Sequence, residues 1–192
     1  MPEKTQPITI SFEDADAMRQ WLEVNYGLTE GIWLKMAKKE APITTVTYQD
    51  ALQVALCFGW IDGQANKLDE HFYLQKFTPR RKRSIWSKRN VDIAERLITE
   101  GKMHPAGMLE IEKAKADGRW ENAYESSRNM AIPKDFLKAV AENEQANQFF
   151  QTLNKTNLFA IAFRLTTAKS PATRAKRFTQ IMEMLERKEK LY

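Results

Sequence analysis

The sequence predicts an α+β fold, with a small N-terminal sheet that carries helices on one face, followed by a mostly helical C-terminal subdomain. Two patterns predict it: residues 8–78 alternate short β-prone runs with helical patterns, and residues 84–192 have helical periodicity almost throughout. Hydrophobic residues make up 43% of the 192-residue chain, which is enough for a sizeable core. We therefore expect subdomains at 1–83 and 84–192, packed together as one structural unit.

The first elements follow from short-range patterns. Residues 8–10 form a β-prone run, and Ser11 with Asp14 makes a capping box for a helix that ends near Gly27. Residues 31–37 are predicted as a strand because two sets of side chains alternate there: Ile32, Leu34 and Met36 with Trp33, Lys35 and Ala37.

A helix, a hairpin and a helical tract follow. Thr47 and Asp50 make a second capping box for a helix that ends at Gly59. Residues 60–65 and 71–77 indicate two strands joined by a turn, and Pro79 ends the second. The remaining signals are helical, and the starts are predicted at Ser84 or Ser87, Pro105, Pro133, near Phe149, near Leu158, and at Ser170.

The charge of the chain is concentrated in residues 76–90. This stretch contains seven Lys and Arg residues and no acid, whereas the whole chain has a formal charge of +5, so the remainder carries −2. Clustered cations repel one another unless an anion offsets them. The stretch therefore predicts an anion-facing site, and its position near the subdomain boundary suits a ligand groove.

Composition argues against several classes of protein. No apolar run approaches the roughly 20 residues of a membrane span, and no apolar signal segment follows the N-terminus. Cys57 is the single cysteine, so an internal disulfide is impossible. No GxGxxG, Walker or zinc-ligand pattern is present. We expect a cytoplasmic protein that uses no cofactor or metal.

The candidate site is built on Arg80, Arg81, Lys82 and Arg83. Arginine offers a planar fork of donors that matches phosphate or carboxylate, although a solvated loop that pairs with nearby acids is the alternative. Ser84, Ser87 and Asn90 precede or open a helix, where free backbone N–H groups favour anions. Capping of that helix by one serine is expected as well.

Trp60, Trp86 and Asp62 complete the candidate ligand-binding set. Either tryptophan can stack on a base or an arginine, although burial in the core is the more common role. Asp62 is interpreted as the ion-pair partner of an arginine in the loop, with a general base or a turn acid as alternatives.

Other polar residues fit structural roles better. Cys57 lies in an apolar helical run and is interpreted as a core residue, and His71 and His104 belong to no catalytic motif. A second basic patch opens the last predicted helix and is interpreted as a solvated surface unless it faces the first; it comprises Lys169, Arg174, Lys176 and Arg177.

Four groups of residues resemble the YdeI/OmpD-associated family, which is also called the bacteriocin-protection family. They are residues 48–52 with the Gly-Trp-Ile-Asp-Gly of 59–63, the Phe77–Asn90 stretch, Met103–Gly107, and 168–177. The resemblance covers roughly residues 28–188, and Ala172 stands where that family's pattern has a glutamate. It implies a role in tolerance to bacteriocins or cationic peptides, and it implies no reaction, cofactor or catalytic residue.

Three functions remain open. The first is a non-enzymatic protein that binds an anionic ligand or partner in envelope-stress tolerance. The second is a nucleic-acid-binding protein that uses the basic loop and Trp86, without any helix-turn-helix, RRM or zinc-finger signature. The third is an enzyme for a phosphorylated or carboxylated small molecule, in which Asp62, Ser84 or Ser87, and an arginine supply base, orienter and charge stabiliser.

Overall fold

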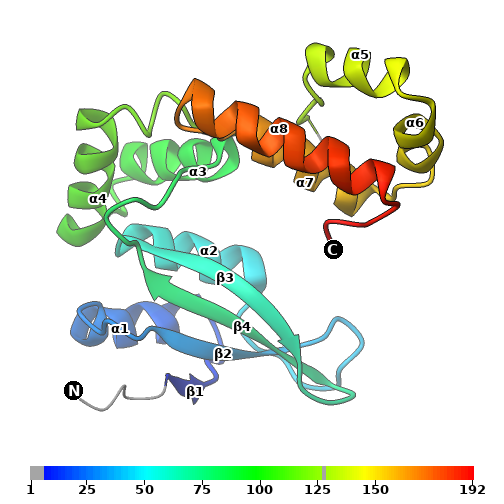
Figure 1. Ribbon diagram of the computed structural model, residues 1–192. Helices are drawn as coiled ribbons and strands as arrows, with labels where there is room; N and C mark the ends of the chain where they lie inside the picture. The colour runs from blue at the N-terminus through cyan, green and yellow to red at the C-terminus, as the bar shows by residue number, and fades with distance from the viewer. Residues whose placement is uncertain (1–6, 127–128) are drawn as a thin grey trace, which may run out of the picture. The chain divides into compact units, whose positions relative to one another are not determined.

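In a computed structural model, which describes residues 7–126 and 129–192, the chain divides into two compact units, Met1–Ala123 and Tyr124–Tyr192 (Figure 1). The first unit holds a four-stranded sheet with the order β1-β2-β4-β3. The second unit is helical in its regular elements. The predicted α+β fold, with the sheet first and the helices after it, is confirmed.

The sheet is mixed. Strand β1 (Ile8–Ile10) pairs in parallel with β2 (Ile32–Ala37), and helix α1 (Ala15–Asn25) connects them. Strands β3 (Trp60–Lys67) and β4 (Phe72–Pro79) form the predicted hairpin, and β4 pairs antiparallel with β2 on its other side. Helix α2 (Tyr48–Cys57) joins β2 to β3 and lies behind the sheet in Figure 1.

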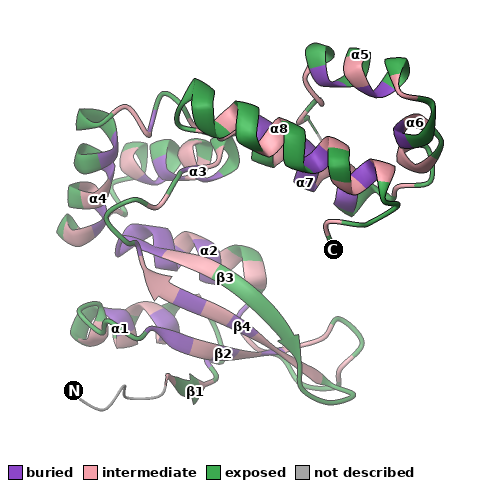
Figure 2. Cartoon of the chain, in the orientation of Figure 1, coloured by how far each residue is buried: buried purple, intermediate pink, exposed green. Residues whose placement is uncertain are grey.

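Side-chain alternation decides which face of the sheet is covered. Buried residues alternate with partly exposed ones along β2 and along residues 74–78 of β4 (Figure 2). The buried set on β2 comprises Ile32, Leu34 and Met36, which pack with Met18 and Leu22 of α1 and with apolar residues of α2. A strand directs successive side chains to opposite faces, so the other face of the sheet carries the alternate set.

The first unit also contains α3 (Lys88–Thr99) and α4 (Pro105–Ala116). Four of their residues are buried in the same core as the sheet and α2: Ala94, Leu97, Ile111 and Ala114. The subdomain boundary predicted at residue 83 is therefore wrong, because the break between the units follows Ala123. The expectation that the sheet-containing part and the helical part of the chain pack together as one structural unit stays a prediction.

The second unit contains α5 (Lys134–Glu142), α6 (Glu144–Phe150), α7 (Lys155–Thr166) and α8 (Pro171–Glu186). Its separate core comprises Phe136, Val140, Ala146, Ile161, Leu165, Ile181 and Leu185. Asn157, on α7, is 2% exposed, and its side-chain oxygen accepts hydrogen bonds from the backbone N–H groups of Leu191 and Tyr192 at 3.0 and 3.2 Å. The end of the chain is thereby held against α7.

Most predicted caps are correct. Thr47, Ser87 and Ser170 each accept a hydrogen bond from a backbone N–H three residues later, as N-cap residues do. The prediction for Ser11 is wrong, because Asp14 caps α1 while the Ser11 hydroxyl donates to the Lys35 carbonyl at 3.0 Å. The cap thus lies directly before the first helical residue, Ala15.

Candidate anion-binding site

Arg80 is the anchor of the basic loop, residues 80–83, rather than its exposed tip. Its side chain is 7% exposed, and Cζ lies 3.4 Å from the ring centroid of Trp86, which is 1% exposed. Arg80 also donates from Nη1 to the Ile85 carbonyl at 3.3 Å and from its backbone N–H to the Gly59 carbonyl at 3.0 Å. A desolvated guanidinium on an indole face is a favourable cation–π contact, so this pair fixes where the loop leaves β4.

The exposed part of the loop is a turn closed by Ser84. The Ser84 hydroxyl accepts from the backbone N–H of Arg81 at 2.9 Å, and the Ser84 N–H donates to the Arg81 carbonyl at 2.8 Å. Arg81, Lys82 and Arg83 are exposed on this turn. Among the described residues, none of these three cations has an acid within ion-pair distance, and the alternative of pairing with nearby acids is therefore not observed.

Two more cations stand at the start of α3, directly after the Ser87 cap. Lys88 and Arg89 occupy its first turn, which contains no acid. Free N–H groups and the helix dipole make this end of α3 positive as well. Arg119 donates from Nη1 to the Ser84 carbonyl at 2.8 Å and so connects the loop to the segment after α4.

Asp62 is held by a tyrosine. Its Oδ2 accepts from the Tyr48 hydroxyl at 2.7 Å. Burial, followed by this hydrogen bond, raises the pKa of Tyr48 to about 12, and Arg89 opposes the shift. Arg89 Cζ lies 5.6 Å from the Tyr48 ring centroid. The ion pair predicted between Asp62 and residues 80–83 does not occur among the described residues, since Tyr48 holds that carboxylate.

Three further members of the predicted set are buried. Trp60 is 0% exposed and donates from Nε1 to the Tyr26 carbonyl at 2.9 Å, which makes it a core residue. Trp86 packs edge-on against Trp120, with 4.8 Å between ring centroids. Asn90 is 7% exposed, and its backbone N–H donates to the Ser87 hydroxyl. The structure thus brings Arg80 and Trp86 together beneath the loop, and Ser87 and Asn90 together at the start of α3.

The motif 103–107 has a packing role. The backbone N–H of His104 donates to the Cys57 carbonyl at 3.1 Å, and the His104 ring stacks on Phe58 with 4.7 Å between centroids. A Cβ at Gly107 would lie 2.1 Å from the Cys57 oxygen, so only glycine lets α4 approach α2 here. Cys57 is itself 0% exposed, and burial raises the pKa of its thiol. Such a thiol suits the core position inferred from the sequence.

The second basic patch lies in the second unit and is partly used there. Arg174 forms an ion pair with Asp135 at 2.8 Å, and Arg177 donates from Nη1 to the Arg164 carbonyl at 2.7 Å. These contacts give both arginines a local role. They support the interpretation of this patch as an ordinary helix surface.

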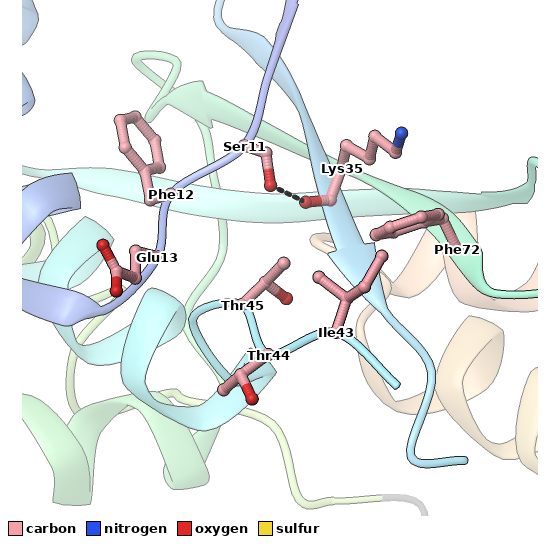
Figure 3. Close-up of a pocket in the computed structure, with 8 residues that line it drawn as sticks. All are labelled: Ser11, Phe12, Glu13, Lys35, Ile43, Thr44, Thr45 and Phe72. Carbon is pink, nitrogen blue, oxygen red and sulfur yellow. Dashed lines mark hydrogen bonds between the residues drawn. The ribbon is translucent and has the colours of Figure 1, made fainter. Parts of the chain in front are cut away.

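A pocket of about 190 Å³ lies elsewhere in the first unit (Figure 3). None of its lining residues belongs to the predicted site; they are Ser11, Phe12, Glu13, Lys35, Ile43, Thr44, Thr45 and Phe72. The sequence could have predicted one of the lining residues, because the alternation of residues 32–37 directs the Lys35 side chain away from the buried face. The remaining residues meet through pairing between distant segments, which the sequence does not reveal.

The described residues contain no cluster of three His, Cys, Asp or Glu side chains that could hold a metal ion. No helix within residues 7–126 and 129–192 is both long and apolar enough to cross a membrane.

Comparison with known proteins gives one match for each part of the chain. A family model described as a domain of unknown function (DUF8412) matches residues 10–110. A second family model, described as bacteriocin-protection, YdeI or OmpD-associated, matches residues 129–188. The motifs at 48–63, 77–90 and 103–107 therefore lie within the first match, and the stretch 168–177 lies within the second. No curated protein and no solved structure matches the chain.

Proposed function

Since the chain belongs to the DUF8412 family through residues 10–110 and to the bacteriocin-protection, YdeI or OmpD-associated family through residues 129–188, we propose that it is a binding protein for an anionic ligand or partner. The proposed contacts are Arg81, Lys82 and Arg83, supported by Arg89 and the start of α3. The second family is the one that the sequence motifs predict. We propose that the protein acts in the cytoplasm.

The observation that carries the proposal is the contrast within the loop. Arg80 is buried on Trp86, whereas its three neighbours are exposed and have no ion-pair partner among the described residues. A closed turn holds these like charges together against their mutual repulsion. A bound phosphate or carboxylate would relieve that repulsion and accept charge-assisted hydrogen bonds.

The positive charge of the loop also limits how the protein could act in bacteriocin tolerance. Exposed arginines repel a cationic peptide, so the loop is unsuited to capturing one directly. The proposed partner is instead an anionic molecule or an acidic protein surface, through which tolerance would be exerted.

The contacts favour binding over catalysis. The Ser84 and Ser87 hydroxyls each accept a backbone N–H, and Asp62 accepts from Tyr48. An activated serine needs a general base within hydrogen-bond reach, and the described residues place none beside either hydroxyl. We therefore rank the binding protein above the enzyme.

The test is a binding screen with the double variant R81A/R83A. Probes are pyrophosphate, polyphosphate, nucleoside triphosphates and phosphorylated sugars, each examined by thermal shift and calorimetry at low and physiological salt. We expect one class to bind the parent protein and to bind the variant about tenfold or more weakly for each arginine removed.

The matched control is K39A/K67A, which removes the same charge from exposed sites of the first unit. Equal loss in both double variants would indicate a nonspecific effect of net charge and would contradict a defined site. Unchanged binding in R81A/R83A, with native circular dichroism, would also contradict the proposal.

A further inference from the structure

The aromatic residue in the nucleic-acid hypothesis was Trp86, and the structure buries it beneath Arg80. Other rings lie on the sheet face opposite α1 and α2. On β2, Trp33 and Lys35 belong to the partly exposed set, in alternation with the buried Ile32, Leu34 and Met36. On β4, register places Lys76 opposite Trp33 and Phe72 opposite Ala37, so these side chains share that face. We call it the open sheet face.

The open sheet face combines aromatic and basic groups. Strand register assigns ten residues to it: Thr9, Trp33, Lys35, Ala37, Ile61, Asn66, Phe72, Leu74, Lys76 and Thr78. Two of the ten are lysines and none is an acid. Neither lysine has an ion-pair partner among the residues that the structure describes, although Glu30 is close enough to act on Lys76 and Asp69 is close enough to interact with Lys35. The face therefore has a local excess of positive charge.

Each ring is paired with one of the lysines. Lys35 Nζ lies 4.0 Å from the Phe72 ring centroid, and Lys76 Nζ lies 5.2 Å from that of Trp33. Figure 3 shows the Lys35 side chain passing beside the Phe72 ring at the rim of the pocket. Each ammonium group lies over its ring, so a ligand that stacks there has to draw the lysine aside. A ligand with both a flat face and a negative charge is suited to this, because its charge offers the ammonium group a new partner.

We propose that the open sheet face binds single-stranded nucleic acid, with bases stacking on Trp33 and Phe72 and phosphates contacting Lys35 and Lys76. Stacking on aromatic side chains and backbone contacts to cations are how proteins hold single strands without reading sequence. Trp33 is four residues along β2 from Ala37, the partner of Phe72. This separates the two rings by about 13 Å along the strand, or about four steps of a stacked strand.

The same chemistry argues against other polyanions. In a duplex the base faces are already stacked on one another, so they are not available to the two rings. An acidic polypeptide supplies charge but no base to stack. The proposal uses residues distinct from Arg81 and Arg83, so it stands or falls separately from the proposed function of the basic loop.

The experiment measures binding of a fluorescein-labelled DNA of about 12 nucleotides, and of the RNA of the same sequence, by anisotropy at low and physiological salt. We expect the single strands to bind at least about tenfold more tightly than the matching duplex. Binding should quench tryptophan fluorescence in the parent protein, and most of that quenching should be lost in Trp33→Leu.

Two variants separate stacking from charge. W33L/F72L should weaken single-strand binding at least about tenfold while the salt dependence of the remaining binding is retained. K35A/K76A should weaken binding and also flatten its dependence on salt. K39A/K67A is the control for net charge, and W33F should restore most of the affinity lost in W33L, because it restores a ring.

Several outcomes would overturn the inference. These are equal affinity for duplex and single strand, competition by poly-glutamate as effective as by unlabelled oligonucleotide, and full affinity in a folded W33L/F72L protein. Absence of measurable binding at low salt would overturn it as well. Loss of binding in R81A/R83A alone would assign the nucleic acid to the basic loop and likewise reject the sheet face.

Discussion

The guanidinium of Arg80 lies over the indole of Trp86, with 3.4 Å between Cζ and the ring centroid. The first residue of a four-cation run is thereby buried, and the other three are exposed. A run of similar residues thus divides into one structural member and three that face solvent. The division determines which substitutions test folding and which test binding.

Arg80→Ala should destabilise the first unit by about 2 kcal/mol, the order expected for a desolvated cation–π contact. Arg81→Ala should change stability by less than about 0.5 kcal/mol, because that side chain is exposed. Urea denaturation followed by fluorescence measures both variants. Equal stabilities of R80A and R81A would contradict the anchor role of Arg80.

Gly107→Ala should be destabilising by about 1–3 kcal/mol, although alanine is the better helix former by about 1 kcal/mol. The new Cβ would lie 2.1 Å from the Cys57 oxygen and 2.7 Å from its carbonyl carbon, so α4 would have to move away from α2. Gly27→Ala is the matched control, because nothing lies within 4 Å of its Cβ position. Thermal denaturation of both proteins checks this, and a stable G107A would show that the helices separate at little cost.

Local sequence signals predicted the elements well. Thr47, Ser87 and Ser170 were identified as possible caps from residue type and spacing alone, because a cap bonds to a residue only three positions away. Ser11 was assigned the same role, but Asp14 offered a competing cap adjacent to the helix, and Ser11 bonds to β2 instead.

The arrangement of the site could not be predicted in the same way. Tyr48 and Asp62 meet because α2 packs on β3, and no local pattern connects them. The boundary at residue 83 failed for a similar reason, since amphipathic patterns in α3 and α4 do not indicate which core they enter. Alternation placed Trp33 on the face opposite Ile32, but only the register with β4 brings Phe72 to that face.

Stability should fall more steeply at alkaline pH in the parent protein than in Tyr48→Phe. The pKa of Tyr48 is raised from 10.0 to about 12 in the folded protein, so its stabilising contribution is complete below pH 10 and is lost as pH rises through about 12. Phenylalanine has no hydroxyl to ionise and loses that part of the slope. Urea denaturation across this range compares the two proteins, and parallel pH profiles would show that burial and the Asp62 bond together do not hold the proton on Tyr48.

Asn157→Ala should release the end of the chain from the second unit. The buried side chain accepts from the N–H groups of Leu191 and Tyr192, and its Nδ2 donates to the Asn154 side chain at 2.9 Å. Losing a buried group that satisfies several partners costs about 1–3 kcal/mol, and no other side chain in the described residues replaces it as the acceptor for those two amides. Hydrogen exchange at Leu191 and Tyr192 should become fast in the variant, while amides in α8 stay protected.

Thr156→Ala, at an exposed neighbouring position of α7, is the control and should leave both amides unchanged. Slow exchange of the two amides in N157A would mean that packing of Leu191 against the core of the second unit is sufficient to hold the chain end.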